Sequence, residues 1–275
     1  MGKRFRVRMV PLVPIIFSWL ALSMVMQLSG CAGHTSGAGG GTDLVTDSDE
    51  PDSSKRARIR LELAVGYFDK GQTTVALDEL KQSINANPNL FEAYNLRGLI
   101  YMRLNDVSLA EESFRRALNI NPKAANVQHN YGWLLCQQSR MPESFKMFAN
   151  ALANPAYGDR AKTWMAQGWC QLKSGQDTDA EASFQRSYEL DAGNPITGYN
   201  LALLLFKRGE FVRAQFYVRR INNSELANAE SLWLGIKVER RLASPDTMAQ
   251  LGGQLRKRFP QSPETSAFDR GAFDE

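Results

Sequence analysis

Histidine and cysteine are scarce in this sequence. Among 275 residues there are two histidines and three cysteines, which leaves few side chains for proton transfer near neutral pH, for a thiol nucleophile or for a metal site. The composition therefore disfavours a hydrolytic or redox enzyme. We expect no catalytic residues, no metal, no cofactor and no small-molecule substrate.

An excess of positive charge is also missing from most of the chain. The whole sequence has a net charge of +4, with 33 basic and 29 acidic residues, but residues 1–30 contain four of the bases and no acid. The remaining 245 residues carry 29 basic and 29 acidic side chains. Because nucleic-acid binding needs a basic surface, we expect no nucleic-acid partner. The four N-terminal bases are Lys3, Arg4, Arg6 and Arg8.

The N-terminus has the order of a secretory signal: a basic start, the uncharged apolar stretch Met9 to Leu28, small residues and a cysteine. Length alone does not distinguish this stretch from a membrane anchor of about 20 residues. Its ending, Leu28-Ser29-Gly30-Cys31, resembles the bacterial lipobox. The resemblance implies that residues 1–30 are a signal peptide removed before Cys31 and that Cys31 is acylated, which anchors the protein in lipid. Ala32 stands where the inner-membrane retention signal has Asp, which implies the periplasmic face of the outer membrane.

Residues 31–54 are rich in Gly, Ser, Thr and Asp, including Gly39-Gly40-Gly41. With almost no apolar side chain to bury, this segment is predicted to be a flexible tether.

The sequence from 55 to 261 repeats itself at a spacing of 34 residues. Pro88 and Pro122 stand 34 apart, as do Gly98 and Gly132, while the third unit is two residues longer. Small residues at position 8, Gly at 15, Ala at 20, an aromatic or apolar residue at 24 and Pro at 32 resemble the tetratricopeptide repeat. The predicted fold is an all-α tetratricopeptide superhelix of six helix-turn-helix units. The units are 57–90, 91–124, 125–160, 161–194, 195–228 and 228–261, followed by a loose tail at 262–275.

The third and fourth units carry a more specific resemblance. The segments Asn130-Tyr131-Gly132, Leu135-Cys136 and Gly168-Trp169-Cys170 are similar to those of the PilF/PilW family of type IV pilus biogenesis lipoproteins, as is the first unit from Arg58 to Ala64. This resemblance covers roughly residues 55–260. It implies an outer-membrane pilotin, whose partners are the pilus secretin subunits and whose role is to promote their localisation and multimer assembly. The alternatives are a periplasmic scaffold lipoprotein for β-barrel assembly or peptidoglycan-hydrolase recruitment, and a lipoprotein enzyme.

The first helix of each unit is expected to line the inner surface of the array, mainly through positions 2, 5, 9, 12 and 13. In the first two units several of these positions are apolar, which suits an amphipathic or extended partner segment. The predicted partner groove consists of Leu61, Val65, Phe68, Leu99 and Met102. The rival site is the aromatic stripe Trp169, Tyr199 and Phe206, and each groove residue could instead pack against a neighbouring helix. His129 is interpreted as a structural or groove residue because no second ligand follows at i+4.

Cys136 and Cys170 are predicted to form a disulfide. Once Cys31 is acylated, two thiols remain in an oxidising compartment. They occupy positions 12 and 10 of adjacent units, about 200° apart around an ideal helix, which suits a bridge between stacked helices. The alternative is a pair of buried free thiols.

Overall fold

The structure, a computed structural model, describes residues 51–274, and its regular elements in that span are all α-helices. The predicted all-α fold is confirmed there. The predicted signal peptide, Cys31 and the tether up to residue 50 lie outside the described residues. In the described span, no helix has the length and apolarity that a membrane crossing demands. The helices are α1 (Asp52–Asp69), α2 (Thr73–Ala86), α3 (Phe91–Arg103), α4 (Val107–Ile120), α5 (Ala125–Gln137), α6 (Met141–Leu152), α7 (Arg160–Lys173), α8 (Asp177–Leu190), α9 (Pro195–Lys207), α10 (Phe211–Asn222), α11 (Ala229–Arg241), α12 (Pro245–Arg258) and α13 (Pro263–Arg270).

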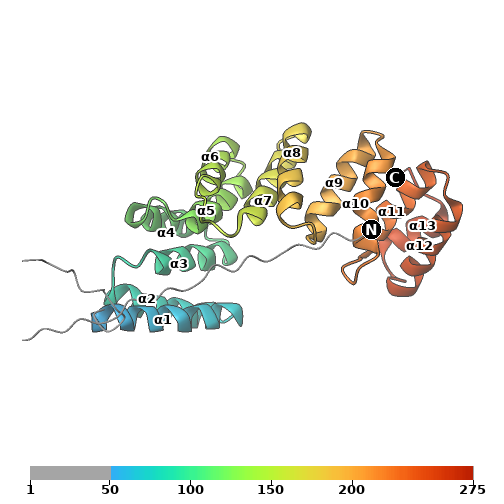
Figure 1. The fold of residues 1–275 in the computed structure, drawn as a ribbon. Helices are drawn as coiled ribbons and strands as arrows, with labels where there is room; N and C mark the ends of the chain where they lie inside the picture. Colours follow the sequence, from blue (N-terminus) through green and yellow to red (C-terminus); the bar gives the residue numbers. More distant parts are fainter. Residues whose placement is uncertain (1–50, 275) are drawn as a thin grey trace, which may run out of the picture. The chain divides into compact units, whose positions relative to one another are not determined.

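The helices α1 to α12 form six helix-turn-helix units that follow one another along the chain (Figure 1). In each unit the odd-numbered helix, called helix A, packs against the even-numbered helix B, and each helix B packs against the next helix A. This is the order of contacts expected for stacked repeats, in which each unit touches only its neighbours.

A residue in the left-handed conformation stands two positions after the end of every helix A. It is a glycine at 71, 175 and 209, with φ between 75° and 83°, while Asn105, Ser139 and Ala243 take the same conformation with φ between 52° and 60°. The left-handed residue stops the helix and turns the chain towards helix B. This turn is therefore present in all six units, including those without glycine and the sixth, where Ser244-Pro245-Asp246 was expected to replace it. We number positions within a unit so that this residue is 15.

The turns between units use a side-chain cap. After α2, α4, α6 and α8, a side-chain Oδ1 accepts a hydrogen bond from the backbone N–H two residues further on, at 3.0–3.2 Å. Asn and Asp favour this turn because the side chain replaces a backbone acceptor. The four residues are Asn87, Asn121, Asn154 and Asp191.

The two helices of a unit cross where position 8 of helix A meets position 24 of helix B, and the sizes of the two side chains are inversely related. Glycine faces phenylalanine in three units: a Cβ added to Gly98 would lie 2.5 Å from the ring of Phe114. Alanine accompanies a medium-sized residue in two units, and in the sixth the order is reversed. The pairs are Ala64/Leu80, Gly98/Phe114, Gly132/Phe148, Gly168/Phe184, Ala202/Val218 and Ile236/Gly252.

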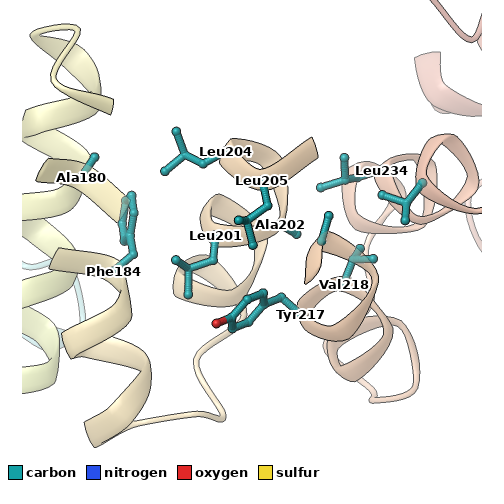
Figure 2. Packing of buried hydrophobic residues seen from close by; sticks show 11 residues of the cluster. Ala180, Phe184, Leu201, Ala202, Leu204, Leu205, Tyr217, Val218 and Leu234 are labelled. Carbon is teal, nitrogen blue, oxygen red and sulfur yellow. The ribbon is translucent and has the colours of Figure 1, made fainter. Parts of the chain in front are cut away.

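Buried side chains between units continue the same core. Figure 2 shows the cluster in which side chains of α8, α9, α10 and α11 meet around Leu201 and Leu205. Phe184 of the fourth unit and Leu234 of the sixth belong to this cluster, so the fifth unit is held on both sides by apolar contact. Apolar burial of this kind is the main source of stability in stacked repeats.

The prediction of a loose tail at 262–275 is wrong. Residues 263–270 form α13, and Phe268 packs so close to Gly252 that no Cβ could be added there. Phe273 then stacks on Trp233, with the ring centroids 5.5 Å apart. The physical reason is the reversed pair of the sixth unit, because the small Gly252 leaves space that an aromatic ring from α13 fills.

The start of the repeat array also differs slightly from the prediction. The helix α1 begins at Asp52, inside the segment assigned to the tether. Asp52 stands in the first turn of α1, where a negative charge is favourable to the helix dipole.

We predict that Gly98→Ala destabilises the protein by about 1–2 kcal/mol. Alanine is about 1 kcal/mol better than glycine inside a helix, but overpacking against the fully buried Phe114 ring outweighs that gain. Gly66→Ala is the matched control because its new Cβ meets no atom within 4 Å, so it should stabilise. Urea unfolding followed by circular dichroism measures both, and a Gly98→Ala protein as stable as the wild type would contradict the crossing constraint.

Candidate interaction surfaces

The inner surface is built from neighbouring A helices. The helices α1, α3, α5 and α7 pack side by side in sequence, and α9 packs beside α11. Some of the cations at position 13 connect these neighbours. Arg103 donates a hydrogen bond to the backbone oxygen of Phe68 at 2.7 Å, and Lys173 approaches the oxygens of Cys136 and Gln137 at 3.4 and 3.3 Å. These cations lie at the carbonyls that end the preceding helix A, where positive charge is favourable.

The five predicted groove residues lie on α1 and α3, and four of them are half-buried. Leu61 and Phe68 pack against the core cluster of the first unit, and Leu99 and Met102 against that of the second. The Phe68 ring is further covered by the guanidinium of Arg103, 3.8 Å from its centroid. Val65 is 41% exposed and is the most open of the five. Packing against neighbouring helices, the alternative role, thus accounts for much of the surface of the other four.

A second apolar surface on α1 was missed from the sequence. Ile59 and Leu63 are 56% and 43% exposed, and with Tyr67 they line a pocket of about 320 Å³ on α1. At the corresponding positions of the third unit, Val127 and Tyr131 are buried because α4 covers them. The first unit has no preceding helix B among the described residues. The signal was available in the sequence as apolar residues at i, i+4 and i+8.

The helices α5 and α7 are linked more strongly than the other A helices. A disulfide joins Cys136 to Cys170, whose Cα atoms are 5.9 Å apart, within the range a disulfide requires. The structure thus pairs the two cysteines that the sequence analysis pairs. The Trp133 and Trp169 rings lie 5.2 Å apart beside the disulfide. This region, the α5–α7 seam, joins the third and fourth units covalently.

His129 belongs to the same seam as a buried structural residue. Its Nδ1 lies 2.8 Å from the hydroxyl oxygen of Thr163, and its ring contacts that of Phe148. Burial, with a smaller contribution from Lys162, lowers the pKa of His129 to about 4. The imidazole is therefore neutral at physiological pH, and the groove role that was considered for it does not fit its 6% exposure.

The rival aromatic stripe is only partly open. Trp169 is 39% exposed, and Ile196, on the next helix A, is 53% exposed. Tyr199 and Phe206 are half-buried, and Lys237 lies 5.9 Å from the Phe206 ring centroid. Burial, together with the charges of Glu230 and Glu264, raises the pKa of Tyr199. This stripe therefore offers two exposed apolar side chains at separate positions.

Residues 51–274 hold no cluster of three or more His, Cys, Asp or Glu side chains that could bind a metal ion. The described apolar surfaces, in contrast, have the chemistry of protein recognition, since exposed aliphatic and aromatic groups beside charged ones are typical of such sites.

Family models assign the repeat. Models described as tetratricopeptide repeat match residues 91–124 and 130–195, and one described as TPR repeat matches residues 66–105. Together with the helix-turn-helix units and the small residues at the helix crossings, these matches define the fold as a tetratricopeptide-repeat superhelix.

Similar proteins show to which group of tetratricopeptide-repeat proteins this chain belongs. The type IV pilus assembly protein PilF of Pseudomonas aeruginosa is 28% identical over 249 residues, which cover 90% of this chain and 96% of PilF. The solved structure of P. aeruginosa PilF superimposes with a TM-score of 0.74 at 27% identity. The match covers 80% of this chain and 100% of the PilF chain. The crystal structure of PilW, described as a widely conserved type IV pilus biogenesis factor, has a TM-score of 0.68 at 30% identity and covers 77% of this chain and 97% of PilW. The chain is a PilF/PilW-like tetratricopeptide-repeat protein.

Removing the disulfide should loosen the seam locally. We predict that Cys136→Ala with Cys170→Ala lowers the stability of the third and fourth units by roughly 3–4 kcal/mol, the chain-entropy value for a loop of 34 residues. Because stacked repeats couple only to their neighbours, the loss should be concentrated there. Hydrogen exchange checks this: protection should fall in α5 and α7 and stay unchanged in α1 and α12. A uniform loss across all units, or none in α5 and α7, would contradict the local role.

The buried His129 should make stability depend on pH. Its pKa is about 4 in the folded protein and 6.5 when unfolded, so its contribution is present in full above pH 6.5 and is lost as the pH falls towards 4. The full loss is roughly 3 kcal/mol. We predict a smaller decrease in unfolding free energy between pH 6.5 and 4.5 for His129→Asn than for the wild type, measured by urea titration at each pH. Parallel pH profiles for the two proteins would show that His129 does not cause the dependence.

Proposed function

We propose that this protein acts in type IV pilus biogenesis as an outer-membrane pilotin, a lipid-anchored protein that binds pilus secretin subunits and promotes their localisation and multimer assembly. The observation that carries the proposal is the likeness to PilF, which extends over 90% of this chain and 96% of that protein. A likeness restricted to single repeats would support only the fold.

The lipid anchor belongs to the proposal as well. The segment ending at Cys31 has the order of a lipoprotein signal, and Ala32 follows the cysteine. Acylation at Cys31 places the repeats on the periplasmic face of the outer membrane, because several acyl chains at one residue bind a bilayer stably. In this arrangement the first unit is the part of the repeat array closest in sequence to the membrane.

The first unit offers the best surface for the secretin. Two apolar areas meet on α1: Val65 beside the half-buried groove residues of α1 and α3, and the outward-facing Ile59 and Leu63. Neither area belongs to the third and fourth units, which the disulfide joins. Burying Ile59 and Leu63 against a partner contributes about 3 kcal/mol, or two orders of magnitude in affinity.

The test is secretin assembly in cells that produce variants of this protein. We predict that Ile59→Ser with Leu63→Ser reduces secretin multimers to the level seen without the protein, because the partner loses both anchors. Val65→Ser, on the inner side of α1, shows whether the groove side contributes. The readouts are the proportion of secretin in multimers on native gels and the secretin content of the outer membrane.

The matched control is Val212→Ser with Phe216→Ser, since these residues are also exposed and four apart on a helix, α10. This control should assemble secretin normally. Cys31→Ser tests the anchor separately, because it should leave the repeats folded but reduce the amount of secretin in the outer membrane. Normal multimers with the α1 double variant, combined with a normal thermal melt, would place the binding surface elsewhere.

A further inference from the structure

Position 4 of helix A and position 26 of helix B vary together among the units. The second and fourth units have an aromatic residue at position 4 and an arginine at 26, whereas the first and third have neither. The fifth unit departs from this pattern because it keeps the arginine, Arg220, but has Gly198 at position 4. The two complete pairs are Tyr94 with Arg116 and Trp164 with Arg186.

The second unit shows what the arginine does. The guanidinium carbon of Arg116 lies 5.6 Å from the centroid of the Tyr94 ring, and that of Arg97 lies 5.1 Å from it. Tyr94 is buried beneath them. These distances are within the range of an attractive cation–π contact, so the arginine of helix B covers the aromatic ring of helix A.

In the fifth unit the corresponding place is a pocket. It has a volume of about 290 Å³, and its lining is predominantly apolar: Tyr188, Gly198, Tyr217, Arg220, Ile221 and Leu226 contribute to it. Gly198 brings no side chain into this place, and Ile221 borders it closely: a Cβ at position 198 would lie 3.3 Å from the Ile221 side chain. Ligand pockets commonly measure about 300–1,000 Å³. At the small end of that range, the pocket suits a single side chain better than a nucleotide or a similar cofactor.

Arg220 remains available in this pocket. Its guanidinium carbon lies 6.0 Å from the Tyr188 ring centroid, at the outer limit of such contacts. Within residues 51–274 its side chain forms neither an ion pair nor a hydrogen bond. At the same pocket Leu226 is 54% exposed. An aliphatic occupant gains burial alone, while an aromatic one also gains the cation–π contact that Tyr94 makes with Arg116.

We propose that the pocket of the fifth unit accepts an aromatic side chain of a partner protein, in the place that Tyr94 fills in the second unit. The partner segment presents one aromatic residue beneath Arg220 and an apolar neighbour against Leu226. This surface lies on α8, α9, α10 and the loop that follows α10, and it uses none of the α1 residues, so it stands independently of the secretin proposal.

The experiment follows the Arg220 Nε–H signal by NMR in the detergent-solubilised full chain labelled with ¹⁵N-arginine, and Arg220→Ala assigns that signal. The probe is N-acetyl-L-tyrosinamide, with N-acetyl-L-leucinamide as the aliphatic comparison. We expect a saturable shift of the Arg220 signal and an affinity for the tyrosine probe roughly three- to tenfold higher than for the leucine probe. The Arg116 signal is the internal control and should not move, because Tyr94 already occupies its site.

Gly198→Tyr should fill the pocket from within and abolish the titration. If that variant fails to fold, Leu226→Ser decides instead, because the exposed side chain is not needed for folding and its loss should weaken the tyrosine probe.

Three results would overturn the proposal: no saturable shift, equal affinity for the leucine probe, or unchanged binding to folded Gly198→Tyr or to Leu226→Ser. A shift that appears without probe, grows with protein concentration and disappears in Phe216→Ser would also overturn the partner assignment. It would assign the pocket to the exposed Phe216 of a second copy.

Discussion

The space available where two helices cross is the constraint on which the rest of the structure depends. In every unit, position 8 of helix A and position 24 of helix B share one volume, so a larger residue on one helix requires a smaller one on the other. Gly98 with Phe114 and Ile236 with Gly252 are the two extremes. Since each helix B also supports the next helix A, the crossing distance within one unit affects how its neighbours stack.

The ends and the middle of the repeat array satisfy this constraint differently. In the middle, the disulfide and the Trp133–Trp169 contact hold α5 against α7. At the C-terminal end, the reversed pair of the sixth unit is completed by Phe268 of α13. At the N-terminal end, no described element covers Ile59 and Leu63. The apolar surface of α1 therefore lies in a unit that the disulfide does not join.

Much of the fold could be predicted because the spacing of the repeat fixes which residues occupy equivalent positions in successive units. The spacing of 34 located the turns, and even the turns at Asn105, Ser139 and Ala243, which lack glycine, take the left-handed conformation that the repeat requires. The same spacing brought Cys136 and Cys170 to adjacent helices.

The remaining features depend on contacts between units, which periodicity does not determine. Phe268 and Phe273 are isolated apolar residues in a polar stretch, and their importance follows only from the empty place at Gly252. Leu61 and Leu99 are half-buried beside fully buried residues of the same helices, so the sequence pattern alone does not separate packing positions from exposed ones. The pocket beside Gly198 is recognised only when the surroundings of Arg220 are compared with those of Arg116 in the second unit.

The side of α1 that no described element covers has a thermodynamic consequence. Among the described residues the first unit has one neighbouring unit, and a unit with a single neighbour frays more readily than an internal one. Any segment that docks on Ile59 and Leu63 takes the place of a preceding helix B, so it stabilises the folded form of the first unit as well as burying its own surface. Binding and local folding are then linked: the melting temperature of this end rises with ligand concentration, and the observed affinity includes the free energy of ordering α1.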